Sequence, residues 1–339
     1  MIIRYRKATY REYGQVVCFL NQITVRNAFT EKWLKWKYLQ NPAGQSHMYF
    51  AVDTRMNALV GIYCLIGWNL ICGNKLVHCA QSVDTMIHPR YRGQGIVEKL
   101  SEFMFEDLKK TGVNALFGFP NEKFYPITLK IGWKGLGRME NYVKLLSVEI
   151  LPEKFRQYFP RFIRVGFDGL LHLYDRILSF CCGHDYSLQE TVTFEGVEEA
   201  TFSYWDANRT NRSPDYLNWR YVQKPENRYR IYCLEKARKK MCWIVSNDRD
   251  NESHILDIIP VQQDAIMPAL LLFSMAMREE GKECVRLCCY GQIGKHAAKA
   301  GFIYREKTQQ IIFYEMDNHG PFNVDRNHWH FMHGDFDAV

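Results

Sequence analysis

Several features that mark secreted, membrane-spanning or zinc-binding proteins are missing from the sequence. Three cations lie within the first seven residues, but no apolar stretch follows them, so we expect no secretory signal. The longest uncharged apolar run, Ala265 to Met277, contains Pro268 and is shorter than the roughly 20 residues of a membrane span. The eleven cysteines include no Cys-x-x-Cys pair, and their two vicinal pairs do not suit ordinary disulfide geometry. These absences predict a cytoplasmic protein with reduced thiols.

A strong excess of charge is missing as well. The chain carries 44 Lys and Arg against 37 Asp and Glu, and the net charge of +7 is spread along its length. No basic stripe and no single-strand reader motif occurs, so we do not expect nucleic-acid binding. Apolar residues, in contrast, make up 47% of the 339 positions, which excludes a disordered chain and predicts two domains at this length.

An internal repeat indicates what these two domains are. Residues 33–42 read Trp-Leu-Lys-Trp-Lys-Tyr-Leu-Gln-Asn-Pro, and residues 216–225 read Tyr-Leu-Asn-Trp-Arg-Tyr-Val-Gln-Lys-Pro, at an offset of 183. Further along, the segment from Lys130 to Trp133 resembles the segment from Lys299 to Phe302 at an offset of 169. An offset this long indicates a duplicated domain rather than a solenoid, whose repeats are about 20–50 residues long.

Each copy alternates strand and helix patterns, which predicts a mixed α/β fold with a central sheet flanked by helices. In the first copy we expect strands at 2–6, 48–53, 59–66, 77–87, 115–119 and 142–148, and helices from the capping box at Thr9 to Leu20 and over 96–110. In the second copy we expect strands at 229–235, 241–246, 254–259 and 284–289, and a helix over 268–280. The predicted domains are 1–150, with a connector at 151–195, and 196–339.

The connector has a helical pattern between Pro152 and Cys182 in which cations lie among aromatic and aliphatic residues. Such a segment is compatible with an amphipathic element on a membrane surface. It is equally compatible with an interdomain helix that packs on both copies. We favour the interdomain helix and do not expect membrane contact.

The residues that indicate chemistry lie where a strand of the first copy gives way to a helix. The segment from Arg90 to Gly95 has the form Arg-x-x-Gly-x-Gly, and Asn121 follows 26 residues after its end. Glycines allow backbone N–H groups to close around an anion, and the helix N-terminus adds its positive dipole. Arg90 and Arg92 supply charge-assisted contacts to a phosphate.

With this signature the first copy, from Ile2 to about Val148, resembles the GNAT superfamily of acyl-CoA-dependent N-acyltransferases. The resemblance implies an enzyme that uses acyl-CoA as its donor without a metal. It implies a coenzyme A site formed by Met86, Ile87, Arg90, Arg92, Gly93, Gln94, Gly95, Ile96, Asn121 and Phe124. The second copy resembles the same fold without the signature, because residues 258–266 lack the glycines. We therefore expect the second copy to shape the acceptor pocket.

Catalysis by such a protein requires an oxyanion donor and a route for protons. The amides of Met86 and Ile87 are the candidate donors, since a bulged strand leaves backbone N–H groups free. Asp84 is the first candidate for a base or an ammonium ligand, although backbone N–H groups satisfy many carboxylates at strand ends. His88 is the alternative base, or a turn residue before Pro89. Tyr125 is a candidate acid, or a packing residue, because the tyrosine of the family lies where this chain has Thr128.

Candidates for acceptor binding lie outside the signature. Trp36, Tyr38, Trp219 and Tyr221 either form aromatic walls for a base or sugar or belong to the core. Near the C-terminus, His333, Asp335 and Asp337 lie in a segment that either folds over the acceptor cleft or frays. The three histidines in this segment match no recognised zinc spacing, so we expect no metal there.

The repeat and the tandem layout resemble, more narrowly, N-acyltransferases that act on a dTDP-linked amino sugar in surface-polysaccharide pathways. This resemblance implies a small amine acceptor, with a sugar nucleotide as the first choice. A peptide, polyamine or aminoglycoside amine is the alternative acceptor. A non-catalytic module that binds acyl-CoA or regulates a partner is the alternative function.

Overall fold

The computed structural model describes residues 2–24, 29–73, 75–182, 185–197, 207–226, 228–316, 322, 325 and 328–336. Its strands are β1 (Ile3–Lys7), β2 (His47–Asp53), β3 (Ala58–Cys72), β4 (Lys75–Ile87), β5 (Ala115–Gly118), β6 (Lys134–Leu145), β7 (Tyr186–Thr191), β8 (Asn208–Thr210), β9 (Tyr229–Lys236), β10 (Lys239–Arg249), β11 (Glu252–Pro260), β12 (Cys284–Tyr290), β13 (Ile303–Glu315) and β14 (Trp329–Met332). Its α-helices are α1 (Gly14–Thr24), α2 (Glu31–Leu34), α3 (Ile96–Leu108), α4 (Tyr125–Lys130), α5 (Glu153–Arg156), α6 (Arg161–Cys181), α7 (Pro214–Leu217), α8 (Ile266–Glu279) and α9 (Ile293–Lys299).

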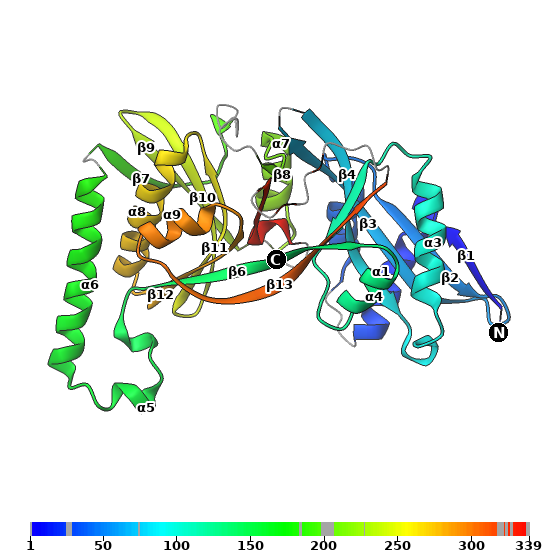
Figure 1. Cartoon of the computed structure of the whole chain (residues 1–339), viewed down its shortest axis with the longest axis horizontal. Coiled ribbons are helices and arrows are strands. Elements are labelled where there is room, and N and C mark those ends of the chain that lie inside the picture. The colour runs from blue at the N-terminus through cyan, green and yellow to red at the C-terminus, as the bar shows by residue number, and fades with distance from the viewer. Residues whose placement is uncertain are drawn as a thin grey trace.

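A single mixed sheet runs through the molecule, in the order β1-β2-β3-β4-β5-β13-β6-β12-β11-β10-β9-β7. The two halves of this sheet repeat one pattern: antiparallel strands lead to a parallel pair, β4 with β5 in the first half and β11 with β12 in the second. Helix α3 covers the first half, while α8 and α9 cover the second (Figure 1). The expected α/β fold with two similar halves is confirmed, and most predicted elements lie within a few residues of their expected bounds.

The halves exchange a strand, which the sequence pattern did not indicate. Strand β6 pairs with β12 of the second half, and β13 inserts between β5 and β6. Both strands are long and cross from one half to the other (Figure 1). The strand expected at 142–148 therefore begins earlier, at Lys134, because its first residues pair with β13. The domain boundaries at 150 and 195 stay a prediction.

The repeated aromatic segments meet at the junction of the halves. The rings of Trp36 and Trp219 stack with centroids 5.1 Å apart. Each indole Nε1–H donates to the backbone carbonyl of the other tryptophan, at 2.7 and 2.8 Å. Both rings are buried, as are Tyr38 and Tyr221, and all four belong to one core cluster that spans the halves. Of the two alternatives for these residues, core packing is confirmed, and the alternative of aromatic walls for a base or sugar is wrong because the rings are buried.

The C-terminal segment is ordered where it is described. Strand β14 pairs with β12 and with β8, and β8 in turn pairs with β3. Trp329 and Phe331 are fully buried among aromatic rings of the junction. This segment therefore ties the two halves together, and fraying is excluded for residues 329–336.

Helix α6 lies at the outer edge of the second half, remote from the first half (Figure 1). Its main packing partners are α8 and the turn at Val148–Ile150. The helix thus contacts residues of both copies, as expected, but it reaches the first copy only at the end of β6 and the turn after it, because β6 carries the chain to the far end of the sheet before the helix begins. Within the described residues, no helix is long and apolar enough to cross a membrane.

Candidate active site

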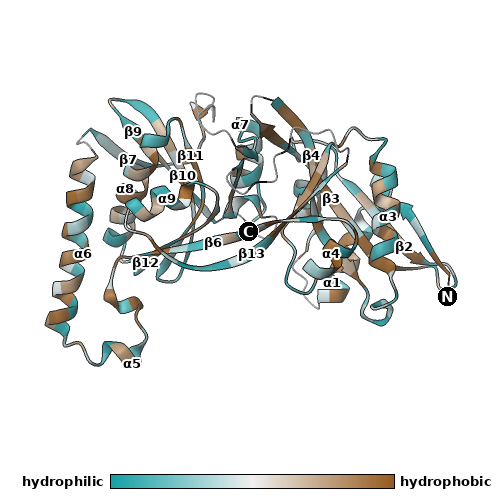
Figure 2. Ribbon diagram, in the orientation of Figure 1, coloured by the Kyte–Doolittle hydropathy of each residue, from teal (hydrophilic) through white to brown (hydrophobic). Residues whose placement is uncertain are grey.

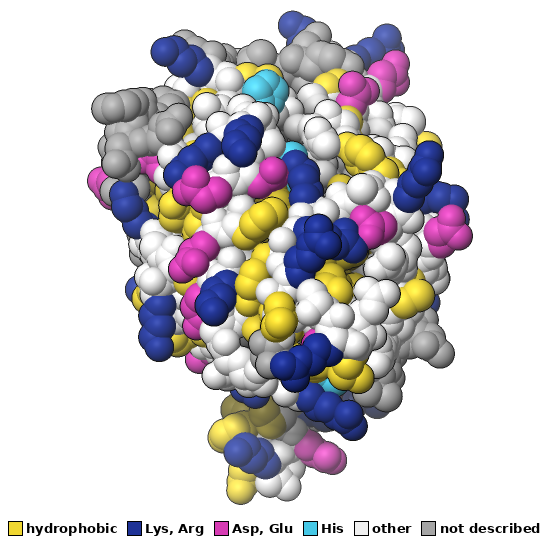
Figure 3. Space-filling view, turned by 90° about the vertical axis from the view of Figure 1, so that its right-hand side faces the viewer, with side chains coloured by type: hydrophobic (Ala, Val, Ile, Leu, Met, Phe, Trp, Pro, Cys, Tyr) yellow, Lys and Arg dark blue, Asp and Glu magenta, His cyan; other side chains and the backbone are white. Residues whose placement is uncertain are grey.

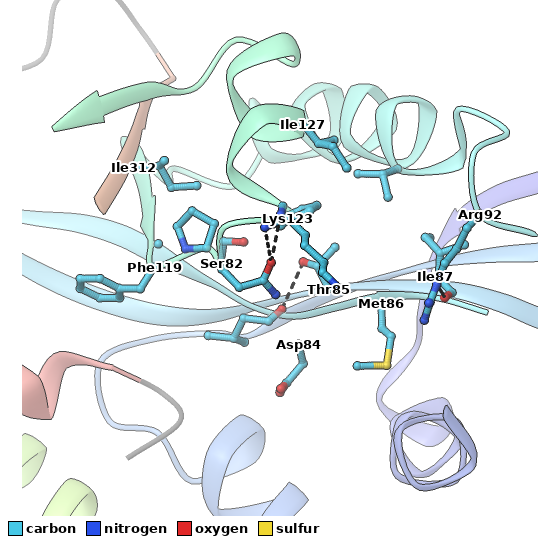
Figure 4. Close-up of a pocket in the computed structure, with 16 residues that line it drawn as sticks. Ser82, Asp84, Thr85, Met86, Ile87, Arg92, Phe119, Lys123, Ile127 and Ile312 are labelled. Atoms are coloured by element: carbon cyan, nitrogen blue, oxygen red, sulfur yellow. Dashed lines mark hydrogen bonds between the residues drawn. The ribbon is translucent and has the colours of Figure 1, made fainter. Parts of the chain in front are cut away.

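The cavity that is lined by Asp84 and by five of the ten expected coenzyme residues lies where β4 and β5 separate. The two strands pair in parallel only from Cys79 to Ser82 of β4. Strand β5 then ends at Gly118, whereas β4 continues to Ile87. The gap between them is a cavity of about 490 Å³, whose other walls come from the segment after β5, from α4 and from β13 (Figure 4).

A β-bulge distorts β4 at this cavity. Val83 lies opposite Cys64 and Met86 lies opposite Ile62, so two residues of β4 face the single Tyr63 of β3. Asp84 adopts a positive φ of 41° to accommodate the extra residue. A bulge bends its strand and increases the local twist, which helps β4 diverge from β5.

Beyond the bulge, the strand pairing determines which amides face the cavity. The N–H of His88 donates to the carbonyl of Val60 on β3 at 2.9 Å. Because backbone groups of an antiparallel strand alternate between its two sides, Met86 also directs its N–H toward β3, whereas Ile87 directs its N–H to the open side. Of the two expected oxyanion donors, the Ile87 amide has the suitable direction.

The glycine loop follows directly and leads into α3. Gly93 and Gly95 have φ values of 73° and 70°, which favour glycine, and Gly95 is the residue that precedes the helix. The first N–H groups of a helix have no partner within it and are available to an anion. Arg92 anchors this loop, because its Nε–H donates to the carbonyl of Ile87 at 3.1 Å, and its side chain lines the cavity.

Asp84 has a different environment from the one expected. Its carboxylate accepts from Lys37 Nζ at 2.6 Å and from the hydroxyl of Tyr38, so side chains and not backbone N–H groups satisfy it. The side chain of Lys37 is 3% exposed and that of Asp84 is 14% exposed. Figure 4 shows that Asp84 points away from Thr85 and Lys123, toward the face of β4 opposite the coenzyme side of the cavity.

The other two catalytic candidates are not in the lining. His88 Nδ1 accepts from the N–H of Arg90 at 3.3 Å, as expected for a turn residue. Tyr125 begins α4, and its hydroxyl lies against Gly135 of β6, where an added Cβ would be 2.5 Å from the oxygen. This contact makes Tyr125 a packing residue in the structure and gives no support to its role as an acid.

The expected coenzyme residues divide into two groups. Met86, Ile87, Arg92, Asn121 and Phe124 line the cavity. Asn121 also shapes it, because its Oδ1 accepts from the N–H groups of Lys123 and Phe124 and starts the turn into α4. The remaining five belong to the loop and the helix start, outside the lining, and are Arg90, Gly93, Gln94, Gly95 and Ile96.

Sequence reasoning missed several residues that line the same cavity. Ser82 precedes the bulge, Thr85 belongs to it, and Lys123 adds a cation near Asn121. Alternation along the strand from 77 to 87 contained a signal for Ser82, but nothing local indicated Lys123. Ile312 comes from β13 of the second half, and only the exchange of strands brings it here.

A second cavity, of about 300 Å³, lies where the parallel pairing of β11 with β12 ends, at Ile255 and Leu287. It is lined by Arg249, His254, Arg286 and His333, among others. Burial lowers the pKa of His254 and lowers the pKa of His333 to about 4, so both rings are neutral at pH 7. Arg286 makes a bidentate pair with Glu252, whereas Arg249 is exposed at the rim.

The two cavities share a wall. Gln309, which lines the second cavity, donates to the carbonyl of Phe119 at 2.9 Å, and Phe119 lines the first. The ring of Phe336 also lines the second cavity and packs on the ring of Phe119, with centroids 4.2 Å apart. A molecule that occupies the second cavity therefore lies beside the first.

Asp335 does not reach either cavity. It is fully buried, and both of its oxygens pair with Arg212 at 2.9 and 3.0 Å. It also accepts from the N–H of Met332, so it serves to fold the C-terminal segment. The expectation that Asp335 lies near the substrate is wrong, whereas His333 lines the second cavity; Asp337 lies outside the described residues.

Comparison with known proteins agrees with this geometry. Residues 4–135 match the family model described as an acetyltransferase (GNAT) domain. No curated protein sequence matches the chain significantly. Residues 4–135 thus resemble a GNAT acetyltransferase domain, and the fold around the cavity is GNAT-like.

Solved structures extend the likeness of the fold to almost the whole chain. A conserved protein from Enterococcus faecalis V583, named a probable N-acyltransferase, aligns with a TM-score of 0.68 at 11% identity and covers 93% of this chain and 73% of its own. A GCN5-related N-acetyltransferase from Anabaena variabilis has a TM-score of 0.64 at 13% identity, with the same coverage. N-myristoyltransferase of Saccharomyces cerevisiae, solved with bound myristoyl-CoA, has a TM-score of 0.56 at 8% identity and covers 92% of this chain and 82% of its own.

The outer surface of the first half carries charges of both signs. Figure 3 shows that Lys and Arg side chains on this face are interspersed with Asp and Glu. Among the described residues, no group of three or more His, Cys, Asp or Glu is placed to hold a metal ion.

Proposed function

We propose that this protein transfers an acyl group from acyl-CoA to the amine of a nucleotide-linked amino sugar, by direct attack while both are bound. The observation that supports the donor half is the gap between β4 and β5, with a bulge on one side and the Gly93–Gly95 loop at its end. A thioester in this gap is held beside free strand amides, and its diphosphate has a helix N-terminus to bind.

The residues of the cavity have distinct roles in this proposal. Arg92, with Arg90 at the rim, neutralises the diphosphate, and the amides of Gly93 to Ile96 surround it. The N–H of Ile87 faces the cavity and donates to the thioester oxygen as negative charge develops there. Removing a single donor of this kind costs about 10²–10³ in kcat in other enzymes.

Asp84 acts on the acceptor from the opposite face of β4. Its side chain is partly exposed and pairs with Lys37, so it orients the ammonium of the acceptor. Asp84 accepts a proton from the ammonium, directly or through water, and the free amine attacks the thioester carbon. The tetrahedral intermediate then breaks its C–S bond and releases the CoA thiolate, which takes the second proton of the attacking nitrogen. Binding both reactants in one site supplies much of the rate, because it converts a bimolecular step into a unimolecular one.

The second cavity supports an anionic acceptor. Arg249 and Arg286 place two guanidinium groups at it, against the single carboxylate of Glu252. Phosphate groups are favoured partners of guanidinium because they accept bidentate hydrogen bonds. Since this cavity shares a wall with the first, a sugar nucleotide bound by its diphosphate there has its amino group directed to the thioester.

The donor half is tested by measuring acyl-CoA binding to the wild type and to Gly93→Asp and Gly95→Asp. We expect acetyl-CoA or a longer acyl-CoA to raise the Tm of the wild type and to leave the Tm of both variants unchanged. Gly73→Asp is the matched control, because Gly73 has a positive φ of 59° and open space around it, but lies in the β3–β4 turn. Equal binding by all four proteins would contradict the proposal.

The acceptor half is tested by a panel of amines with acetyl-CoA and longer acyl-CoAs. We expect turnover with dTDP-amino sugars that falls at least tenfold for Arg249→Gln, as a charged contact predicts. Turnover with peptides, polyamines or aminoglycosides, and none with sugar nucleotides, would replace the acceptor while leaving the donor half intact.

A further inference from the structure

The segment α5–α6 exposes an unusual amount of apolar surface. Of the 23 large apolar side chains that are exposed among the described residues, twelve lie between Phe155 and Phe180. Phe162 is 76% exposed, Phe180 is 66% exposed and Leu170 is 63% exposed. Apolar residues recur along the whole length of α6 at the edge of the molecule (Figure 2). Single exposed apolar side chains are normal, but a continuous set of them marks a binding surface.

Helix α6 is turned the opposite way from an ordinary amphipathic helix. Its two acidic side chains face the protein: Asp175 pairs with Lys144 at 2.7 Å and with Arg278 at 2.8 Å. Two turns earlier in the helix, Asp168 accepts from Ser147 Oγ and from the N–H of Val148, both at 2.8 Å. These contacts fix the rotation of the helix about its axis.

The inward polar contacts are specific enough to exclude a simple reversal. Asp175 is 1% exposed and Lys144 is 3% exposed, so turning the apolar side inward would leave buried charges without partners. Losing one member of a buried ion pair costs about 3–5 kcal/mol. The apolar face of α6 is therefore held outward by the fold.

Charges around this face have one predominant sign. On α6 the exposed charged residues are Arg161 and Arg176, whereas its two acidic residues face the protein. On the preceding segment Lys154 and Glu153 are both exposed. A second copy of this chain would therefore bring the same cations against the apolar face without an excess of acidic partners.

We propose that the face formed by Phe155–Phe180 binds the surface of a membrane that contains anionic lipids. The 21 residues of α6 extend about 30 Å, and the helix lies in the plane of the membrane. Aromatic and aliphatic side chains enter the boundary between headgroups and acyl chains, while Arg161, Arg176 and Lys154 extend to the phosphates. The site between β4 and β5 remains in water, at the other half of the molecule (Figure 1).

Vesicle flotation tests this proposal without reference to catalysis. We expect the full chain to float with vesicles of 70% phosphatidylcholine and 30% phosphatidylglycerol, and to float at least tenfold less with phosphatidylcholine alone. Phe162→Glu combined with Leu170→Glu is expected to abolish flotation. Arg161→Gln combined with Arg176→Gln is expected to weaken binding to the anionic vesicles only.

The control replaces an equally exposed apolar residue elsewhere. Met56 is 70% exposed in the turn between β2 and β3, so Met56→Glu is expected to leave flotation unchanged. Failure of the wild type to float, or equal loss in the Met56 variant, would overturn the proposal. Light scattering measures the oligomeric state. If the wild type is a dimer and Phe162→Glu makes it a monomer, this face binds a second copy and the membrane proposal is overturned.

Discussion

At the scale of single residues, buried histidines connect the stability of this protein to pH. His47, on β2, is 3% exposed, and its Nδ1 has no hydrogen-bond partner among the described residues. Burial, reinforced by the nearby charge of Lys7, lowers the pKa of His47 to about 4. Its pKa in the unfolded chain is about 6.5, so the unfolded state binds more protons at every pH between these two values. Stability is therefore lost as the pH falls through this range.

We predict that the contribution of His47 to the free energy of unfolding falls by about 1–2 kcal/mol as the pH is lowered from 7 to 5. His47→Gln, measured by urea denaturation at pH 7, 6 and 5, is expected to show a smaller loss than the wild type. Some dependence remains in the variant, because burial also lowers the pKa of His330 and His333. His78→Gln, at an exposed position, is the control; a wild type that is equally stable at pH 7 and pH 5 would contradict the prediction.

At the scale of elements, both repeated aromatic segments use a tyrosine to bind an aspartate, but the two aspartates differ in their environment. Tyr38 donates to Asp84 in the first half, and Tyr221 donates to Asp257 at 2.8 Å in the second. Asp257 is fully buried and is also bound by Arg212, which itself pairs with Asp335. In the second half the aspartate thus belongs to a buried network of ion pairs and hydrogen bonds. In the first half Asp84 is partly exposed, at the bulge beside a cavity.

This difference predicts that replacing the tyrosine by phenylalanine affects activity in the first half and stability in the second. Tyr38→Phe is expected to lower kcat about tenfold, because Asp84 loses a hydrogen bond that orients it. Little stability is lost, because the ion pair of Asp84 with Lys37 remains. Tyr221→Phe is expected to lower the free energy of unfolding by about 1–3 kcal/mol, because a buried carboxylate loses a donor. Its kcat is expected to stay unchanged. Paired kinetics and thermal unfolding separate the two results, and an equal effect of both variants on kcat would refute the assignment.

At the scale of the whole molecule, the exchange of β6 and β13 makes each half depend on the other. Without β13, β5 keeps β4 on one side but loses its partner on the other, residues Ile312 to Glu315, and an unpaired strand edge favours aggregation. Strand β6 would in turn lose both β12 and β13. The sheet of the first half is therefore completed by residues that lie after position 300.

We predict that a fragment of residues 1–150 does not fold to a stable monomer by itself. Co-expression with residues 151–339 is expected to restore a soluble complex, since the missing strands are then supplied in trans. Circular dichroism and size-exclusion chromatography of the fragments decide the matter. A monomeric, cooperatively unfolding fragment 1–150 would show that the exchange is dispensable.

Local signals in the sequence predicted much of this protein. The repeat around Trp36 and Trp219 indicated duplication because both copies preserve the residues that meet at the junction. Periodicity identified β4 and α3, and the Arg90–Gly95 signature located one end of the cavity between β4 and β5, because a turn into a helix N-terminus is encoded by adjacent residues. Five of the ten expected coenzyme residues line that cavity.

Tertiary structure decided what depends on segments distant in the sequence. Ile312 reaches the cavity, Asp335 is buried against Arg212 and the ring of Tyr125 lies against Gly135 only because β6, β13 and the C-terminal segment take these places in the sheet. The outward apolar face of α6 has the same origin. Its pattern predicted an amphipathic helix, but the rotation of that helix is determined by Lys144 and Arg278, on two elements that the fold alone brings to Asp175.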